Sequence, residues 1–207
     1  MARLVARRLG LRFLDTGAMY RAAAWKARQA GLSDPRQIAR MIASTRVEVR
    51  DDGVSCDGED VTRAIRTSEI TEAVRPIADS PECRAELVRL QREVGRGGGL
   101  VTEGRDQGSV VFPDADHKFY LDASVDVRAR RRQAESGGDP EAVRRSIERR
   151  DAEDRSRPVG PLVRPPGARV IDTSGLTVEE VVDRIVAAVR RLPRRSGRGS
   201  GRAGGSS

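Results

Sequence analysis

Three short polar segments carry side chains that could bind a metal ion or a charged ligand. They are Asp15-Thr16-Gly17, Glu103-Gly104-Arg105-Asp106 and Asp122, and each follows an apolar run that predicts a strand. Carboxylates at the carboxyl ends of parallel strands can hold Mg²⁺ or orient a ligand. The same pattern is typical of carboxylates that cap helices, and the residue types alone give the two interpretations equal weight.

Strands that alternate with helices must position these segments. Apolar runs predict strands over 12–15, 100–103, 118–122 and 170–173, and helical periodicity predicts helices over 1–9, 18–29, 35–43, 124–137, 140–157 and 177–191, with a helical region over 68–94 broken at Pro76 and Pro81. The alternation favours a mostly parallel sheet with helices on both faces and ligands outside the carboxyl ends of its strands. A hairpin over 47–50 and 54–57 belongs to an insert, and residues 104–116 are expected to form a loop with too many charges for burial.

Length and composition indicate one compact α/β domain with a small insert. The chain has 207 residues, of which 37% are hydrophobic. No apolar run approaches the length of a membrane-spanning helix and the N-terminus lacks the apolar region of a signal peptide, so we expect a cytoplasmic protein. Cys56, Cys83 and His117 are isolated in the sequence and are expected to be structural.

The positive charge is concentrated at the C-terminus. Six arginines within residues 190–207 account for all but +2 of the formal net charge of +8. Residues 192–207 are rich in Gly, Ser and Arg, so we expect a disordered, solubilising tail. The aromatic residues are scattered and form no stacking platform, so nucleic-acid binding is not expected.

Five segments occur in a fixed order along the chain: LDTGAMYR (14–21), GEDVTRAIR (58–66), VTEGRDQGSVVFPDAD (101–116), KFYLDAS (118–124) and ERRDAEDRSRPVGPL (148–162). Together they resemble the bacterial cytidylate kinase family from Met1 to about Arg191. The resemblance implies a monomeric enzyme that uses ATP and Mg²⁺ to convert CMP or dCMP into CDP or dCDP.

The resemblance also implies the fold, a P-loop nucleoside monophosphate kinase-like three-layer α/β structure with a parallel sheet, a small insert that binds the nucleoside monophosphate, and a lid. On this basis residues 1–43 form the first part of the core, 44–95 the insert, 96–191 the second part of the core with the lid at about 130–160, and 192–207 the tail.

The segment that binds the donor phosphates in this family is not found in the chain. In the family, a strand and a loop of the form G-x-x-x-x-G-K-[ST] precede the helix that begins here, and no part of the 207-residue sequence has that form. We therefore expect the first, central strand of the sheet to be missing and the native protein to be longer than the chain given. The alternative is an inactive remnant that binds CMP without transferring phosphate.

Site residues follow from the resemblance position by position. Thr16, Tyr20, Arg21, Arg105 and Arg157 resemble the group that holds the CMP phosphate, Arg84 and Asp106 the readers of cytosine, and Arg150 and Asp154 the ribose contacts. Arg128, Arg131 and Arg150 resemble the basic lid over ATP, whereas Arg130 and Arg132 are expected on a solvated face. Asp15 and Glu103 are candidates for holding Mg²⁺ through water.

One position departs from the family pattern. Where the family usually presents a Ser to the base, this chain has Arg75 in the segment VRPIADSP. Either the longer cationic side chain crowds cytosine or the alignment shifts by one residue beside Pro76, so base selectivity is less firmly predicted than phosphate binding.

Overall fold

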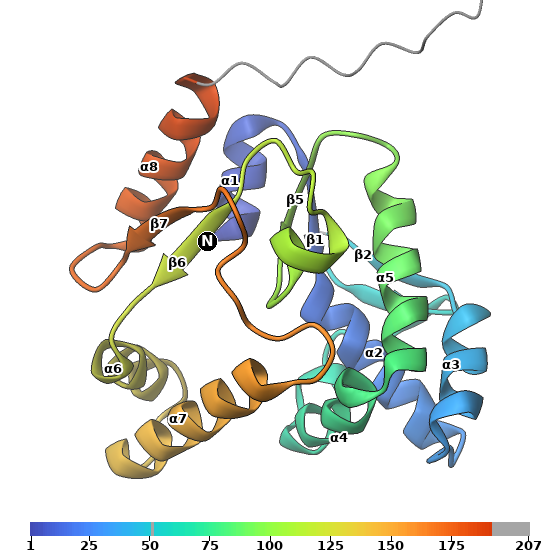
Figure 1. Ribbon diagram of the computed structural model, residues 1–207. Helices are drawn as coiled ribbons and strands as arrows, with labels where there is room; N and C mark the ends of the chain where they lie inside the picture. Colours follow the sequence, from blue (N-terminus) through green and yellow to red (C-terminus); the bar gives the residue numbers. More distant parts are fainter. Residues whose placement is uncertain (51, 192–207) are drawn as a thin grey trace, which may run out of the picture.

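The computed structural model describes residues 1–50 and 52–191, and its elements alternate in the predicted α/β order (Figure 1). Along the chain they are α1 Ala2–Leu9, β1 Arg12–Asp15, α2 Thr16–Gln29, α3 Pro35–Ala43, β2 Val47–Val49, β3 Val54–Cys56, β4 Glu59–Asp60, a 3₁₀ turn Ala64–Arg66, α4 Ser68–Asp79, α5 Pro81–Gly95, β5 Leu100–Glu103, a π-helical turn Gln107–Val111, β6 Phe119–Asp122, α6 Val125–Ser136, α7 Pro140–Ser156, β7 Arg169–Asp172 and α8 Val178–Arg191. The expected tail, 192–207, lies outside the described residues.

Two parallel strand pairs confirm the predicted α/β class. β1 pairs with β5, with Asp15 in register with Glu103, and β6 pairs with β7, with Asp122 in register with Asp172. Among the described strands the two pairs share no hydrogen-bonded neighbour, so the expected sheet is present as two pairs. The central strand that the resemblance implies stays a prediction.

Two apolar clusters hold the fold together. The larger one joins the insert to the first helices through fully buried side chains on α2, α3, α4 and α5, which are Met19, Ile42, Ile77 and Leu87. The smaller one packs α1 against α8, with Val5 against Val181, Val182, Ile185 and Val186 and with Phe119 and Ile171 beneath them. Each side chain contributes roughly 1.5–3 kcal/mol when it is fully buried, so these clusters fix the positions of the strand ends.

The insert contains the predicted hairpin and one strand more. β2 and β3 pair antiparallel, and β4 adds a third strand through Ser55 opposite Asp60. β4 has no separate signal in the sequence because it is only two residues long.

Predicted helix ends are largely confirmed. Asp139 caps α7 by accepting a hydrogen bond from the Ala142 N–H at 2.8 Å, and Thr177 and Glu180 form the predicted reciprocal capping box before α8, at 2.8 and 3.2 Å. The predicted break at Pro76 is wrong, because α4 continues through it to Asp79. Pro76 lies in the last turn of α4, so the missing N–H costs a single hydrogen bond close to the end of the helix. The helix ends only at Ser80.

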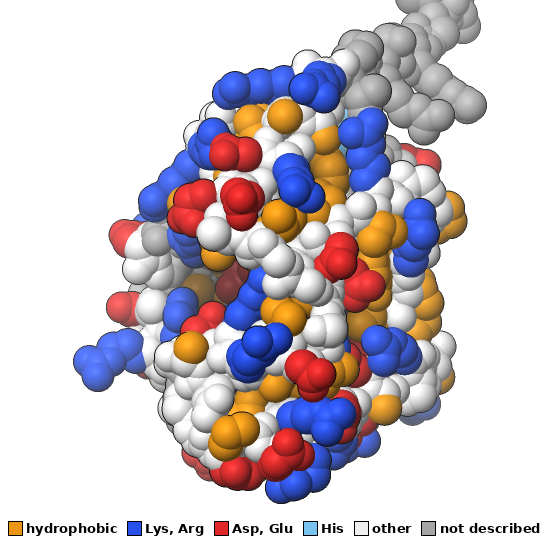
Figure 2. All heavy atoms as spheres, turned by 90° about the vertical axis from the view of Figure 1, so that its left-hand side faces the viewer, with side chains coloured by type: hydrophobic (Ala, Val, Ile, Leu, Met, Phe, Trp, Pro, Cys, Tyr) orange, Lys and Arg blue, Asp and Glu red, His pale blue; other side chains and the backbone are white. Residues whose placement is uncertain are grey.

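No helix within the described residues is both long and apolar enough to cross a membrane. On the face shown in Figure 2, acidic and basic side chains are interspersed, with neither sign covering it alone.

Candidate active site

The carboxyl ends of β1 and β5 bring the first two polar segments together. The Thr16 hydroxyl, buried at the start of α2, donates to the Glu103 carbonyl oxygen at 2.6 Å. Gly104 follows, and a β-carbon there would lie 2.6 Å from Thr16 Oγ1. Any larger residue at position 104 would push the Thr16 side chain aside, so Gly104 lets Thr16 and Arg105 lie at the same edge of the β1–β5 pair.

Asp15 is a helix cap in this structure. Its Oδ1 accepts a hydrogen bond from the Ala18 N–H at 2.8 Å, and its Oδ2 lies 3.4 Å from Arg21 Nη2. Partial desolvation, and then the facing Asp15 carboxylate, raise the pKa of Glu103. Within the described residues no group of three or more His, Cys, Asp or Glu side chains could hold a metal ion. A weaker role for Asp15 and Glu103, acting on Mg²⁺ through water, stays a prediction.

Arg84 and Asp106 form a buried ion pair. Arg84 lies on α5, Asp106 follows β5, and both side chains are at most 8% exposed. The expectation that residues 104–116 are too charged for burial is therefore wrong at Asp106, and the neighbouring Gln107 is buried as well. Asp106 is buried because Arg84 neutralises it, and Gln107 because its amide is hydrogen-bonded to Gln91 at 3.0 Å and to Thr102 at 2.9 Å.

Tyr20 lies against this ion pair. The centre of its ring is 6.0 Å from Arg84 Cζ, within reach of a cation–π contact. Burial raises the pKa of Tyr20 to about 12, with Arg84 and Arg157 opposing the shift and Asp106 adding to it. The phenol is therefore a protonated hydrogen-bond donor at neutral pH.

Asp154 is the centre of a network of ion pairs with arginines. Asp154 is buried, and its two carboxylate oxygens accept from Arg105 Nε at 2.7 Å and from Arg157 Nη2 at 2.9 Å. Arg157 Nε also donates to Asp79 Oδ1 at 3.1 Å. Arg150 is exposed, and partial desolvation and the neighbouring Arg105 lower its pKa. The structure thus gathers three of the predicted arginines, Arg105, Arg150 and Arg157, near the carboxylate of a fourth predicted site residue, Asp154.

Sequence reasoning missed the partners of these groups. Arg75 is exposed and pairs with carboxylates other than Asp106, with its Nη1 3.1 Å from Glu153 Oε1 and its Nε 3.6 Å from Asp79 Oδ2. The spacing of Arg75 and Asp79 by four residues on a helix is the only signal that could have indicated a contact. Glu153 comes from α7, so no local pattern could reveal it.

Arg128 and Arg131 lie apart from this cluster. Arg128 holds both oxygens of Asp151, at 3.0 and 2.7 Å, and so ties α6 to α7. Arg131 donates to Thr173 Oγ1 and to the Leu176 carbonyl oxygen, both at 3.1 Å, and so ties α6 to the segment after β7. Arg130 and Arg132 are exposed, as predicted for a solvated face.

The two cysteines are buried free thiols, and burial raises the pKa of both. Neither Cys56 nor Cys83 is therefore an activated nucleophile, in agreement with the expected structural role.

Comparison with known proteins identifies relatives. A family model described as cytidylate kinase matches residues 1–191. The cytidylate kinase of Symbiobacterium thermophilum is 44% identical over 92% of this chain and 90% of its own length, and that of Pelotomaculum thermopropionicum is 44% identical over 91% and 89%. A bifunctional pantoate ligase/cytidylate kinase of Synechococcus sp. (strain JA-2-3B'a(2-13)) is 44% identical over 95% of this chain, which spans only 39% of that protein.

Proposed function

The chain belongs to the cytidylate kinase family, and from this we propose that it takes part in transferring the γ-phosphoryl group of ATP to CMP or dCMP, giving CDP or dCDP. The observation that carries the proposal is the buried Arg84–Asp106 pair beside Tyr20, next to the arginines gathered around Asp154. The ion pair offers hydrogen-bonding groups that could recognise a base, and the arginines offer positive charge that could bind a phosphate. We further propose that the enzyme acts as a cytoplasmic monomer on these nucleotides.

Asp106 and Arg84 supply the proposed base recognition. A carboxylate can accept a hydrogen bond from the exocyclic amine of cytosine, and a guanidinium can donate to its ring nitrogen and carbonyl oxygen. Uracil has no such amine, so a buried Asp106 would face an acceptor instead of a donor. Unpaired buried acceptors are costly, which favours cytosine.

Arg105 and Arg157 supply the proposed charge on the acceptor phosphate. A phosphate monoester is largely dianionic at neutral pH, so it attacks without a strong general base. Catalysis then depends on holding acceptor and donor in line and on neutralising the charge of the moving phosphoryl group. Asp154 and Asp79 now satisfy these arginines, and a bound phosphate would share their donors.

Hydroxyl groups and a carboxylate complete the proposed acceptor site. Tyr20 stays protonated and can donate to a phosphate oxygen, while Thr16 joins the carboxyl ends of β1 and β5 through its hydrogen bond to the Glu103 carbonyl oxygen. We propose that Arg150 donates to the ribose hydroxyls and that Asp154 accepts from them. Arg128 and Arg131 would act mainly by holding α6 in place for closure over ATP, which excludes water from the reaction.

Mg²⁺ bound with ATP would neutralise charge on the transferred phosphoryl group. Carboxylate oxygens suit this ion, and Asp15 and Glu103 lie in register at the carboxyl ends of β1 and β5. We propose that Asp15 and Glu103 hold the ion through water molecules. The sequence contains no G-x-x-x-x-G-K-[ST] segment, so no residue is assigned to the donor phosphates.

A second candidate function is CMP binding without transfer. It is favoured by the combination of acceptor-site residues with a sequence that has no such donor-phosphate segment. Titration calorimetry of the 207-residue chain with CMP and with ATP, together with a coupled assay of CDP formation, separates the two. Turnover supports the kinase, CMP binding with neither ATP binding nor turnover supports the second function, and the absence of CMP binding contradicts both.

A further inference from the structure

Two ion pairs join the end of α4 to the end of α7. Arg75 on α4 donates from Nη1 to Glu153 Oε1 on α7 at 3.1 Å. Arg157, the residue directly after α7, donates from Nε to Oδ1 of Asp79, the last residue of α4, also at 3.1 Å. Each of the two segments thus supplies one arginine and one carboxylate, and each arginine reaches the carboxylate of the other segment.

The carboxylate of Asp79 is shared between two arginines. Its Oδ1 accepts the hydrogen bond from Arg157, and its Oδ2 lies 3.6 Å from Nε of Arg75, one turn earlier on α4. The Arg157 side chain is only 16% exposed, whereas the Arg75 side chain is 63% exposed. Arg157 is therefore the inner partner of Asp79, and Arg75 is the outer partner.

The negative charge of Asp79 opposes the proposed role of its inner partner. Arg157 is one of the arginines proposed for the acceptor phosphate, and it already donates to Asp79 and, through Nη2, to Asp154 at 2.9 Å. A dianionic phosphate bound by Arg157 would share the guanidinium group with these carboxylates, and like charges repel. Asp79 therefore weakens phosphate binding unless a second cation neutralises it.

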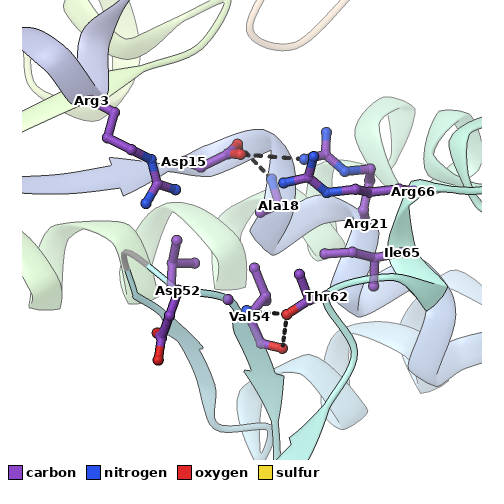
Figure 3. A pocket seen from close by; sticks show the side chains of 11 residues that line it. Arg3, Asp15, Ala18, Arg21, Asp52, Val54, Thr62, Ile65 and Arg66 are labelled. Atoms are coloured by element: carbon purple, nitrogen blue, oxygen red, sulfur yellow. Dashed lines mark hydrogen bonds and ion pairs between the residues drawn. The ribbon is translucent and has the colours of Figure 1, made fainter.

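A comparison with Asp15 shows what Arg75 supplies. Asp15 lies 3.4 Å from Arg21, and it also accepts a hydrogen bond from the Ala18 N–H at the start of α2 (Figure 3). Asp15 thus keeps a partner within the protein when Arg21 turns to a ligand. Within the part of the chain that the structure describes, the one further ion-pair partner of Asp79 besides Arg157 is Arg75.

We infer that Arg75 is a positioning residue for Arg157: it neutralises Asp79 and so makes the inner guanidinium group available to the acceptor phosphate. Its ion pair with Glu153 keeps Arg75 at the junction of α4 and α7, within reach of Asp79. This role involves the phosphate and not the base, although Arg75 stands where the family presents a Ser. The inference rests on the proposed function.

Arg75→Ser tests this inference in the 207-residue chain. Titration calorimetry with CMP and with cytidine, which lacks the phosphate, isolates the phosphate contribution. We expect Arg75→Ser to weaken CMP binding about three- to fivefold, the size of one exposed ion pair, and to leave cytidine binding unchanged. Arg75→Lys should recover most of the CMP affinity because it keeps the charge. Arg89→Ser is the matched control, because Arg89 is exposed and pairs at 2.7 Å with Glu93, four residues later on α5.

Asp79→Asn separates this role from a direct attraction between Arg75 and the phosphate. In the Asp79→Asn background, Arg75→Ser should cost no CMP affinity, because no carboxylate remains to be neutralised. The inference is overturned, while the proposed function stands, if Arg75→Ser weakens CMP binding equally in both backgrounds, weakens CMP and cytidine binding equally, or has no more effect than Arg89→Ser. If the wild type does not bind CMP, the proposed function fails and the inference fails with it.

Discussion

Gly160 lies directly against the guanidinium group of Arg84. A β-carbon at Gly160 would be 1.7 Å from Arg84 Nη2 and 2.8 Å from Asp106 Oδ2, and the backbone there has a φ of +64°. The segment after α7 thus covers the buried ion pair with the one residue type that has no side chain. Cytosine can reach Asp106 only if the residues around Gly160 leave room for it.

Gly160→Ala should displace the Arg84–Asp106 pair. We expect a larger loss of unfolding free energy than for Gly167→Ala, which shares a positive φ of +73° but has open space around its β-carbon. Gly167→Ala should lower the unfolding free energy by about 1–2 kcal/mol, from backbone strain alone. Chemical denaturation of both variants measures the difference, and equal losses would show that Gly160 does not press on the pair.

Asp106→Asn should destabilise the fold strongly. Removing one partner of a buried ion pair leaves the other charge uncompensated, at a cost of about 3–5 kcal/mol. Glu86→Gln removes a partner of the exposed Arg89 and should cost less than about 1 kcal/mol. Urea denaturation compares the two variants, and a similar small effect for both would mean that the Arg84–Asp106 pair is solvated in solution.

Arg75→Ser should leave base selectivity nearly unchanged, although Arg75 stands where the family presents a Ser. The side chain faces Glu153 and Asp79 instead of the Arg84–Asp106 pair. We expect the ratio of CMP to UMP affinity to stay within about threefold and stability to fall by less than about 1 kcal/mol. A large gain in UMP binding or in CMP binding would show that Arg75 does reach the base.

Tyr20 should make the fold less stable at high pH. Burial raises the pKa of Tyr20 to about 12 from 10, so the native state favours the protonated phenol. Its stabilising contribution is complete below pH 10 and is lost as the pH rises from about 10 to 12, by roughly 2–3 kcal/mol. Thermal unfolding of wild type and Tyr20→Phe across this range isolates the effect, and parallel pH profiles would contradict it.

The sequence was most informative where structure depends on neighbours in the chain. The capping box of Thr177 and Glu180 and the cap at Asp139 are contacts across three residues, so local pattern was enough to predict them. The burial of Asp106 depends on Arg84, 22 residues away, and the ion pair of Arg75 depends on Glu153, 78 residues away. No periodicity encodes such distant partners.

Resemblance predicted which residues gather, and physical contacts explain what they do in this structure. Arg105 and Arg157 both contact Asp154 in this structure, and their role in a nucleotide site stays a prediction. Arg128 and Arg131 instead hold α6 against its neighbours, because each guanidinium finds oxygen acceptors on an adjoining element.

Discrimination between CMP and UMP by the 207-residue chain tests the central claim most directly. Titration calorimetry should show CMP binding at least about 10-fold more tightly than UMP, because only cytosine has an exocyclic amine that can donate a hydrogen bond to Asp106. Asp106→Ala should lose this preference, with folding of the variant checked by circular dichroism. Equal affinities of the wild type for CMP and UMP, or no binding of either, would contradict the account.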